Sequence, residues 1–213
     1  MSARDEILAR ARAALADVTA SEADVAVPWT YAQPVDVGDV IATFVERVAD
    51  YRASVVRCEA SDLPTAIADG LAATGTGSAV VPSGLDPAWL AAATGVRFVT
   101  EDAGPLGNDE LNRLDGVVTA AAVGIAETGT IVLDHGPDQG RRALTLVPDR
   151  HVCVVRADQV VSGVPEAVAR LRPSIAERRP LTWVSGPSAT SDIELSRVEG
   201  VHGPRQLYVI VVG

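Results

Sequence analysis

The sequence predicts an α/β protein in which a mostly parallel sheet is flanked by helices, with a short N-terminal helical arm. From about residue 38 onward, helical segments alternate with short β-branched runs, which is the order of a parallel sheet covered by helices. With 213 residues, the chain is long enough for one substantial domain. Aromatic residues make up only 4% of the chain, so Val, Leu, Ile and Ala must fill the core, as they do around buried parallel strands.

Residues 1–34 are predicted to form the arm, and residues 35–213 the α/β domain. Ser2 and Asp5 have the spacing of a capping box for a helix over residues 2–18, whose apolar side chains recur on one face. The proline-bearing stretch after this helix reads as an extended linker. We expect the arm to lie on the main domain; the alternative is a frayed helix followed by a disordered tail.

The first half of the domain is expected to contain three helices and three strands. In chain order, these are a helix over 40–51, a strand over 54–58, a helix that Ser61 caps and that runs to Ala73, a strand over 79–81, a short helix over 86–93 and a strand over 96–100. Pro64 falls in the first turn of its helix, where the missing N–H costs little.

The second half begins with two apolar runs, over 115–123 and 128–134, that a polar island at 124–127 separates. The elements expected after them are a strand over 151–156, a helix over 165–171, a strand over 181–184, a short helix over 193–198 and a closing strand over 207–212.

The composition excludes several classes of function. A net charge of −10 argues against nucleic acid as a partner, because phosphate binding needs a basic face. The chain contains arginine but no lysine, so Schiff-base, pyridoxal phosphate and P-loop lysines are excluded. Cys58 and Cys153 cannot ligate an iron–sulfur cluster by themselves, and His135 and His151 lack the spacing of metal ligands. We therefore expect no metal site and no intrinsic cofactor.

The N-terminal residues carry charges where a secretory signal would be apolar. The chain also lacks a run of about eighteen apolar residues, the length that a membrane span requires. We therefore expect a cytoplasmic protein with no membrane span.

The first candidate site is the segment that follows the 181–184 strand. A strand that leads through Ser185, Gly186 and Ser188 into a helix leaves backbone N–H groups free for a carboxylate or a phosphate. Ser191 and Glu194 have the spacing of a capping box for that helix. Ligands usually bind at the carboxyl ends of the strands of an open parallel sheet, which favours this place. The alternative is a tight turn followed by an ordinary cap.

Two further segments carry polar side chains suited to chemistry. Arg205 can clamp an oxyanion with its two-pronged guanidinium, and His202, three residues earlier, can relay a proton. Glu127 can act as base, nucleophile or ligand anchor, with glycines beside it that allow a ligand to approach the backbone. For these segments the alternatives are surface turns. The ligand-binding residues predicted from all three segments are Gly124, Thr128, Gly129, Ser185, Gly186, Ser188, Thr190 and Arg205.

The loop over 134–140 and the arginines after it form a fourth polar segment. We expect a mobile surface loop; the alternative is that Arg141 or Arg142 borders the pocket and touches an anion.

Four stretches resemble the LUD domain family, of the lactate utilisation protein C type. They are GIAETGTIVL (124–133), LVPDRHVCVV (146–155), SGPSATSDIEL (185–195) and RVEGVHGPRQLYVIVV (197–212). The resemblance implies a fold like that of NagB, RpiA and the CoA transferases. It also implies a non-redox subunit that works beside iron–sulfur partner proteins in the oxidation of L-lactate to pyruvate. In such a subunit the segments above would bind a small carboxylate or phosphate ligand.

A second resemblance supplies the alternative function. Residues 126–129, Ala-Glu-Thr-Gly, are similar to the Ser-Glu-Asn-Gly stretch that carries the nucleophilic glutamate of some CoA transferases, with Ala and Thr in place of Ser and Asn. This likeness implies a stand-alone CoA-transferase-like or sugar-phosphate isomerase-like enzyme that uses Glu127. A third possibility is a purely structural scaffold.

Overall fold

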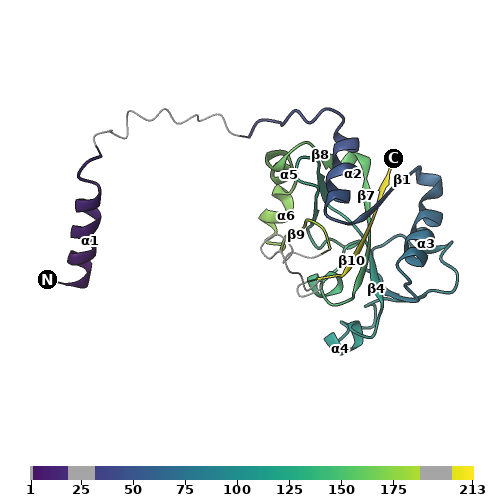
Figure 1. The fold of residues 1–213 in the computed structure, drawn as a ribbon. Helices are drawn as coiled ribbons and strands as arrows, with labels where there is room; N and C mark the ends of the chain where they lie inside the picture. Colours follow the sequence, from purple (N-terminus) through teal and green to yellow (C-terminus); the bar gives the residue numbers. More distant parts are fainter. Residues whose placement is uncertain (1, 19–31, 188–202) are drawn as a thin grey trace. The chain divides into compact units, whose positions relative to one another are not determined.

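The computed structural model of the chain describes residues 2–18, 32–187 and 203–213 (Figure 1). Within it the chain divides into two compact units, Met1–Ala32 and Gln33–Gly213. The short helix expected over 193–198 lies outside the described residues.

The first unit contains helix α1 (Ala3–Ala14). The predicted capping box is confirmed: the Ser2 hydroxyl accepts from the Asp5 N–H at 3.2 Å, and the Asp5 carboxylate accepts from the Ser2 N–H at 2.9 Å. The helix ends four residues before the predicted end at residue 18, and none of its described residues is buried.

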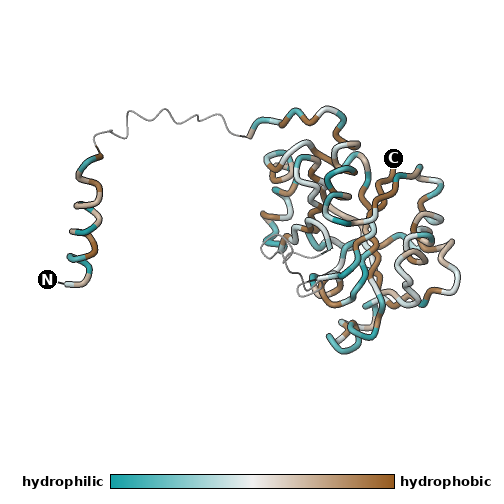
Figure 2. The backbone as a smooth tube through the Cα atoms, viewed as in Figure 1, coloured by the Kyte–Doolittle hydropathy of each residue, from teal (hydrophilic) through white to brown (hydrophobic). Residues whose placement is uncertain are grey.

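A six-stranded parallel sheet forms the centre of the second unit, as the sequence predicts. Its strands, in spatial order, are β1 (Ser54–Cys58), β10 (Gln206–Val212), β7 (Arg150–Arg156), β4 (Gly116–Ala120), β2 (Ser78–Val80) and β3 (Arg97–Val99). The apolar residues of the inner strands are buried on both faces of the sheet, and Figure 2 shows this apolar band along the strands.

Helices α2 (Val40–Asp50) and α3 (Leu63–Ala73) cover opposite faces of this sheet (Figure 1). The side chains of strand β10 alternate between the two faces of the sheet and so contribute to the core on each face. Tyr208 and Ile210 pack in the core that contains α3, whereas Val209 packs against Phe44 and the other buried side chains of α2.

The expected start of the second helix is wrong. Ser61 does not cap it; Ser61 lies in a 3₁₀ turn, η2 (Ala60–Asp62), and α3 begins at Leu63. Asp62 occupies the N-cap position without making a side-chain capping bond. Pro64 in the first turn is confirmed.

A second, four-stranded sheet was not predicted. It contains β8 (Val160–Val161), β5 (Val123–Ile125), β6 (Thr130–Leu133) and β9 (Thr182–Val184), in that order. Strands β5 and β6 form an antiparallel hairpin, and β9 pairs antiparallel with β6. The strand expected over 181–184 is therefore not a member of a parallel sheet but lies at the end of a mixed one.

The remaining short elements connect the two sheets or border them. They are the 3₁₀ turns η3 (Pro87–Leu90), η4 (Arg142–Thr145) and η5 (Ala157–Gln159), and the helices α4 (Asn108–Leu111), α5 (Val164–Arg170) and α6 (Arg172–Ala176). Within the described ranges, no helix has the length and apolar content that crossing a membrane would require.

Candidate functional site

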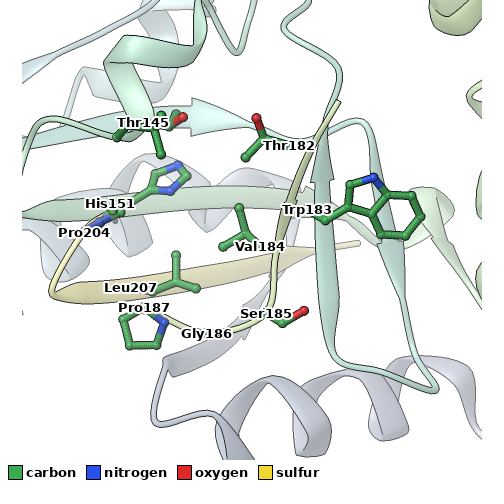
Figure 3. A pocket seen from close by; sticks show the side chains of 12 residues that line it. Thr145, His151, Thr182, Trp183, Val184, Ser185, Gly186, Pro187, Pro204 and Leu207 are labelled. Atoms are coloured by element: carbon green, nitrogen blue, oxygen red, sulfur yellow. The ribbon is translucent and has the colours of Figure 1, made fainter. Parts of the chain in front are cut away.

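A cavity of about 240 Å³ lies where strand β9 passes the first residues of β7 and β10 (Figure 3). It lies beside the amino ends of these parallel strands, and not at the carboxyl ends where the sequence predicts a ligand. The residues that line it are Thr145, Leu146, His151, Thr182, Trp183, Val184, Ser185, Gly186, Pro187, Gly203, Pro204 and Leu207. Figure 3 shows the Trp183 indole pointing away from the His151 ring.

Two of the polar segments singled out in the sequence lie next to each other in the structure. Strand β6, which follows the turn at Glu127, pairs with β9, which leads into Ser185. The Thr128 hydroxyl donates to Thr130 Oγ1 at 2.8 Å, and Thr130 Oγ1 lies 2.8 Å from Ser185 Oγ. Ser185 and Gly186 line the cavity, but Thr128 does not. The hydroxyl chain therefore connects the turn to the edge of the cavity.

The glycines of the 124–129 segment pack against a helix rather than lining the cavity. A Cβ on Gly129, where φ is +59°, would lie 2.6 Å from the carbonyl carbon of Arg47 in α2. A Cβ on Gly124 would lie 3.1 Å from the ring of Phe44 in the same helix. These glycines let the hairpin approach α2, which accounts for them without a ligand.

Glu127 and Arg205 do not line the cavity. Glu127 is exposed in the turn between β5 and β6, where its backbone N–H donates to the Ser162 carbonyl at 3.0 Å. The Arg205 side chain is 61% exposed, with Nε 3.6 Å from Asp149 Oδ1. The structure therefore does not bring these two predicted residues together around this cavity.

Several predicted residues lie outside the described part of the chain, namely Ser188, Thr190, Ser191, Glu194 and His202. The described residues on either side of them, Pro187 and Gly203, both line the cavity.

His151 is a titratable residue of the cavity that was not among the site residues predicted from the sequence. It is the second residue of β7 and is 1% exposed, with Nε2 2.8 Å from the Thr119 hydroxyl. Burial lowers the pKa of its imidazole to about 4, so the ring is neutral at physiological pH. The available signal was its position in an apolar strand two residues before Cys153, which places both side chains on one face.

A buried chain of hydrogen bonds extends from His151 into the sheet. The Thr119 hydroxyl donates to Cys153 Sγ at 3.8 Å, and the Cys153 thiol donates to the Ala120 carbonyl at 3.9 Å. Burial raises the pKa of the Cys153 thiol to about 12, which keeps it protonated and able to donate.

The described lining of the cavity carries no ionised side chain. It consists of hydroxyls, backbone, apolar side chains and the neutral His151. The electropositive surroundings expected for an anion are therefore not provided by the described residues. Nor do the described residues contain a group of three or more His, Cys, Asp or Glu side chains placed to hold a metal ion.

The loop over 134–140 is held by buried side chains and is not the loose surface loop that the sequence suggested. Asp134 and Gln139 are 8% and 4% exposed, and the Asp134 N–H donates to Gln139 Oε1 at 2.7 Å. His135 Nε2 lies 2.8 Å from the hydroxyl of Thr182, a residue of the cavity wall.

Residues 41–212 match the family model of the LUD domain. A curated relative from Deinococcus radiodurans, named "Lactate utilization protein C", is 50% identical over 186 residues and covers 87% of this chain and 85% of its own length. A relative of the same name from Geobacillus thermodenitrificans is 26% identical over 213 residues, covering 93% and 88%. A crystal structure of a DUF162 family protein from Deinococcus radiodurans matches with a TM-score of 0.72 and 44% identity, over 84% of this chain and all of that one.

Proposed function

Since this chain belongs to the LUD domain family, we propose that it acts in lactate utilisation as a non-redox subunit that binds a small 2-hydroxy carboxylate in the cavity beside His151. The role in lactate utilisation is supported by two relatives of that name that cover more than four fifths of this chain. The observation that supports the binding site is that Ser185 and Gly186, selected from the sequence for anion binding, line a cavity with room for a small molecule.

The hydrogen-bond chain behind His151 favours one tautomer of its ring. If the Thr119 hydroxyl donates to Cys153, then Thr119 Oγ1 accepts from a protonated His151 Nε2. The imidazole N–H, the Thr119 hydroxyl and the Cys153 thiol then each donate to an acceptor. The opposite direction would leave the Cys153 sulfur without a donor and satisfy one group fewer. The favoured tautomer has a lone pair on Nδ1, for which the described residues provide no partner.

A lone pair at the cavity wall selects for a ligand that donates a hydrogen bond. The hydroxyl of a 2-hydroxy acid is such a donor, whereas the keto oxygen of the corresponding 2-keto acid only accepts. When a ligand displaces water from the cavity, an acceptor left without a donor is costly, so His151 is expected to favour L-lactate over pyruvate. The aliphatic residues of the cavity, Val184 and Leu207 among them, suit the methyl group of lactate.

The carboxylate of the ligand needs donors that the described lining does not supply. We propose that Ser188, Thr190 and His202, in the segment between Pro187 and Gly203, provide them. Oxidation of lactate releases two electrons, and two cysteines cannot bind an iron–sulfur cluster by themselves. Iron–sulfur partner proteins, acting with this chain in the cytoplasm, are proposed to accept these electrons.

Calorimetry with L-lactate and with pyruvate tests the proposal, using the chain alone and mixed with its iron–sulfur partners. We expect lactate to bind about five- to tenfold more tightly than pyruvate, the value of one hydrogen bond. His151→Phe, which keeps a ring of similar size, should remove this preference. Glu127→Gln is the control. Glu127 lies outside the cavity, so removing its negative charge should not change binding.

Two outcomes would overturn the proposal. If neither acid binds under any of these conditions, the cavity is not the site of a small carboxylate. If Glu127→Gln abolishes binding while His151→Phe does not, the alternative enzyme based on Glu127 is favoured instead. Circular dichroism of each variant establishes that it is folded before binding is compared.

A further inference from the structure

An open hollow of about 670 Å³ adjoins the cavity and is separate from it. The two share a wall, because Thr182 lines the cavity and its hydroxyl lies 2.8 Å from Nε2 of His135, which lines the hollow. Three arginines line the hollow, Arg141, Arg142 and Arg179. Such a group of cations is notable in a chain with a net charge of −10.

Arg179 is fixed in place by buried partners. Its Nη1 lies 2.9 Å from Asp134 Oδ2, and its Nη2 donates to Ser174 Oγ at 2.9 Å. Ser174 in turn donates to Asp134 Oδ2 at 2.5 Å, and both residues are less than 10% exposed. The guanidinium is therefore oriented before any ligand arrives, which reduces the entropy lost on binding.

One donor of Arg179 remains without a hydrogen bond. Its Nε is buried and has no hydrogen-bond partner among the described residues, although the Glu177 carboxylate lies 3.0 Å away as an ion pair. The Glu177 side chain is 66% exposed, so it can turn towards solvent at little cost. An anion with several acceptor oxygens can take its place and complete the bonds of the guanidinium.

The other two arginines differ in their surroundings. Arg141 is bound by both oxygens of Glu101, at 2.7 to 3.0 Å, and donates to the Leu106 carbonyl at 2.6 Å. Arg142 is exposed and has no ion-pair partner among the described residues. Its charge is therefore available to a ligand in the hollow.

We propose that this hollow is a second ligand site and that it binds a small molecule bearing a phosphate group, held by Arg142 and Arg179. Planar guanidinium groups pair with phosphate oxygens in two-pronged fashion, and a phosphate offers more acceptors than a single carboxylate does. The hollow is also more than twice the volume of the cavity, which suits a nucleotide better than a three-carbon acid.

His135 links the hollow to the cavity. Its backbone lies in the left-handed region, with φ +57°, and its ring is held between the Gly140 carbonyl, 2.9 Å from Nδ1, and the Thr182 hydroxyl. A residue other than glycine in this conformation costs energy and is often found at ligand sites. A ligand in the hollow would thus contact the residue that supports one wall of the cavity.

Calorimetry with pyrophosphate, ADP and citrate tests this proposal on the full chain. Pyrophosphate and ADP are expected to bind, and citrate, a tricarboxylate, to bind more weakly. Arg142→Ala should weaken pyrophosphate binding about tenfold, the usual size of one charge-assisted hydrogen bond. Glu177→Gln should strengthen it about threefold, because a competing carboxylate is removed. Arg172→Ala, which removes an exposed arginine of α6 outside the hollow, is the matched control and should leave binding unchanged.

Three results would refute the proposal. The first is no binding of pyrophosphate or ADP at millimolar concentration. The second is citrate binding as tightly as pyrophosphate, which would make the site one for carboxylates. The third is an equal effect of Arg142→Ala and Arg172→Ala, which would show a general effect of charge. Arg142 makes no ion pair within the described residues, so its replacement is not expected to unfold the protein.

Discussion

The neutral state of His151 predicts a specific loss of stability in acid. Burial lowers its pKa from 6.5 to about 4, so the unfolded chain binds a proton more readily than the folded one at intermediate pH. The stabilisation is complete above pH 6.5 and is lost as the pH falls towards 4. The full difference corresponds to about 3 kcal/mol of unfolding free energy, of which about 2 kcal/mol is lost at pH 5.

The carboxylates whose pKa is lowered act in the same direction but at more acid pH. Asp115, for example, accepts a hydrogen bond from the Ser78 hydroxyl, which lowers its pKa below the ordinary value of 3.8. The lowered carboxylates therefore titrate below the interval from pH 7 to pH 5, and a comparison with His151→Phe within that interval measures the contribution of this histidine.

Urea unfolding at pH 7 and pH 5, with the wild-type chain and with His151→Phe, measures this effect. Between pH 7 and pH 5, the free energy of unfolding of the wild type should fall by about 2 kcal/mol more than that of the variant. The variant has its own stability at pH 7, but only the change with pH enters the comparison. An equal loss in both proteins would mean that folding does not lower the pKa of His151, contrary to the burial of its ring in the structure.

Three other predictions concern stability and reactivity. Gly129→Ala should lower the free energy of unfolding by about 2–4 kcal/mol, because the new Cβ meets the backbone of α2 at 2.6 Å. Gly38→Ala, at a similar positive φ with open space around it, should cost only about 1 kcal/mol in the same urea titration. Asp39→Ala should lower the free energy of unfolding by about 1 kcal/mol, because the Asp39 carboxylate accepts from two N–H groups of α2. Asp62→Ala is the control: Asp62 makes no such bond at its N-cap, so its replacement should change the melting temperature little. Cys153 is buried, and burial raises the pKa of its thiol to about 12, so it should resist iodoacetamide at pH 8 until the chain is unfolded. Mass spectrometry of the labelled peptides measures this, and labelling in the native state would contradict the burial of Cys153.

The pattern of apolar residues was sufficient to predict most strands of the six-stranded sheet. The strands over 54–58, 151–156 and 207–212 were each predicted to within one residue, because buried parallel strands appear as continuous apolar runs. The second sheet was missed for the same reason. Residues 116–123 carry no charged side chain and no proline, so the sequence alone did not show that β4 ends at Ala120 and that β5 begins a different sheet at Val123.

The site was predicted in part. Ser185 and Gly186 were found through their turn chemistry, and both line the cavity. His151 was missed because a histidine inside an apolar strand looks like an ordinary core residue until its neighbours across the sheet are known. The glycine at 129 was assigned to a ligand when its actual neighbour is α2, a contact between segments far apart in the sequence that spacing could not show.

The position of β10 in the sheet has a consequence for how the polypeptide is made. This strand lies between β1 and β7, and β1 pairs with no other strand in the described part of the chain. During synthesis β1 emerges from the ribosome long before β10 does, so β1 has no strand to pair with until β10 has been made. The six-stranded sheet is therefore expected to be completed only after β10 has left the exit tunnel.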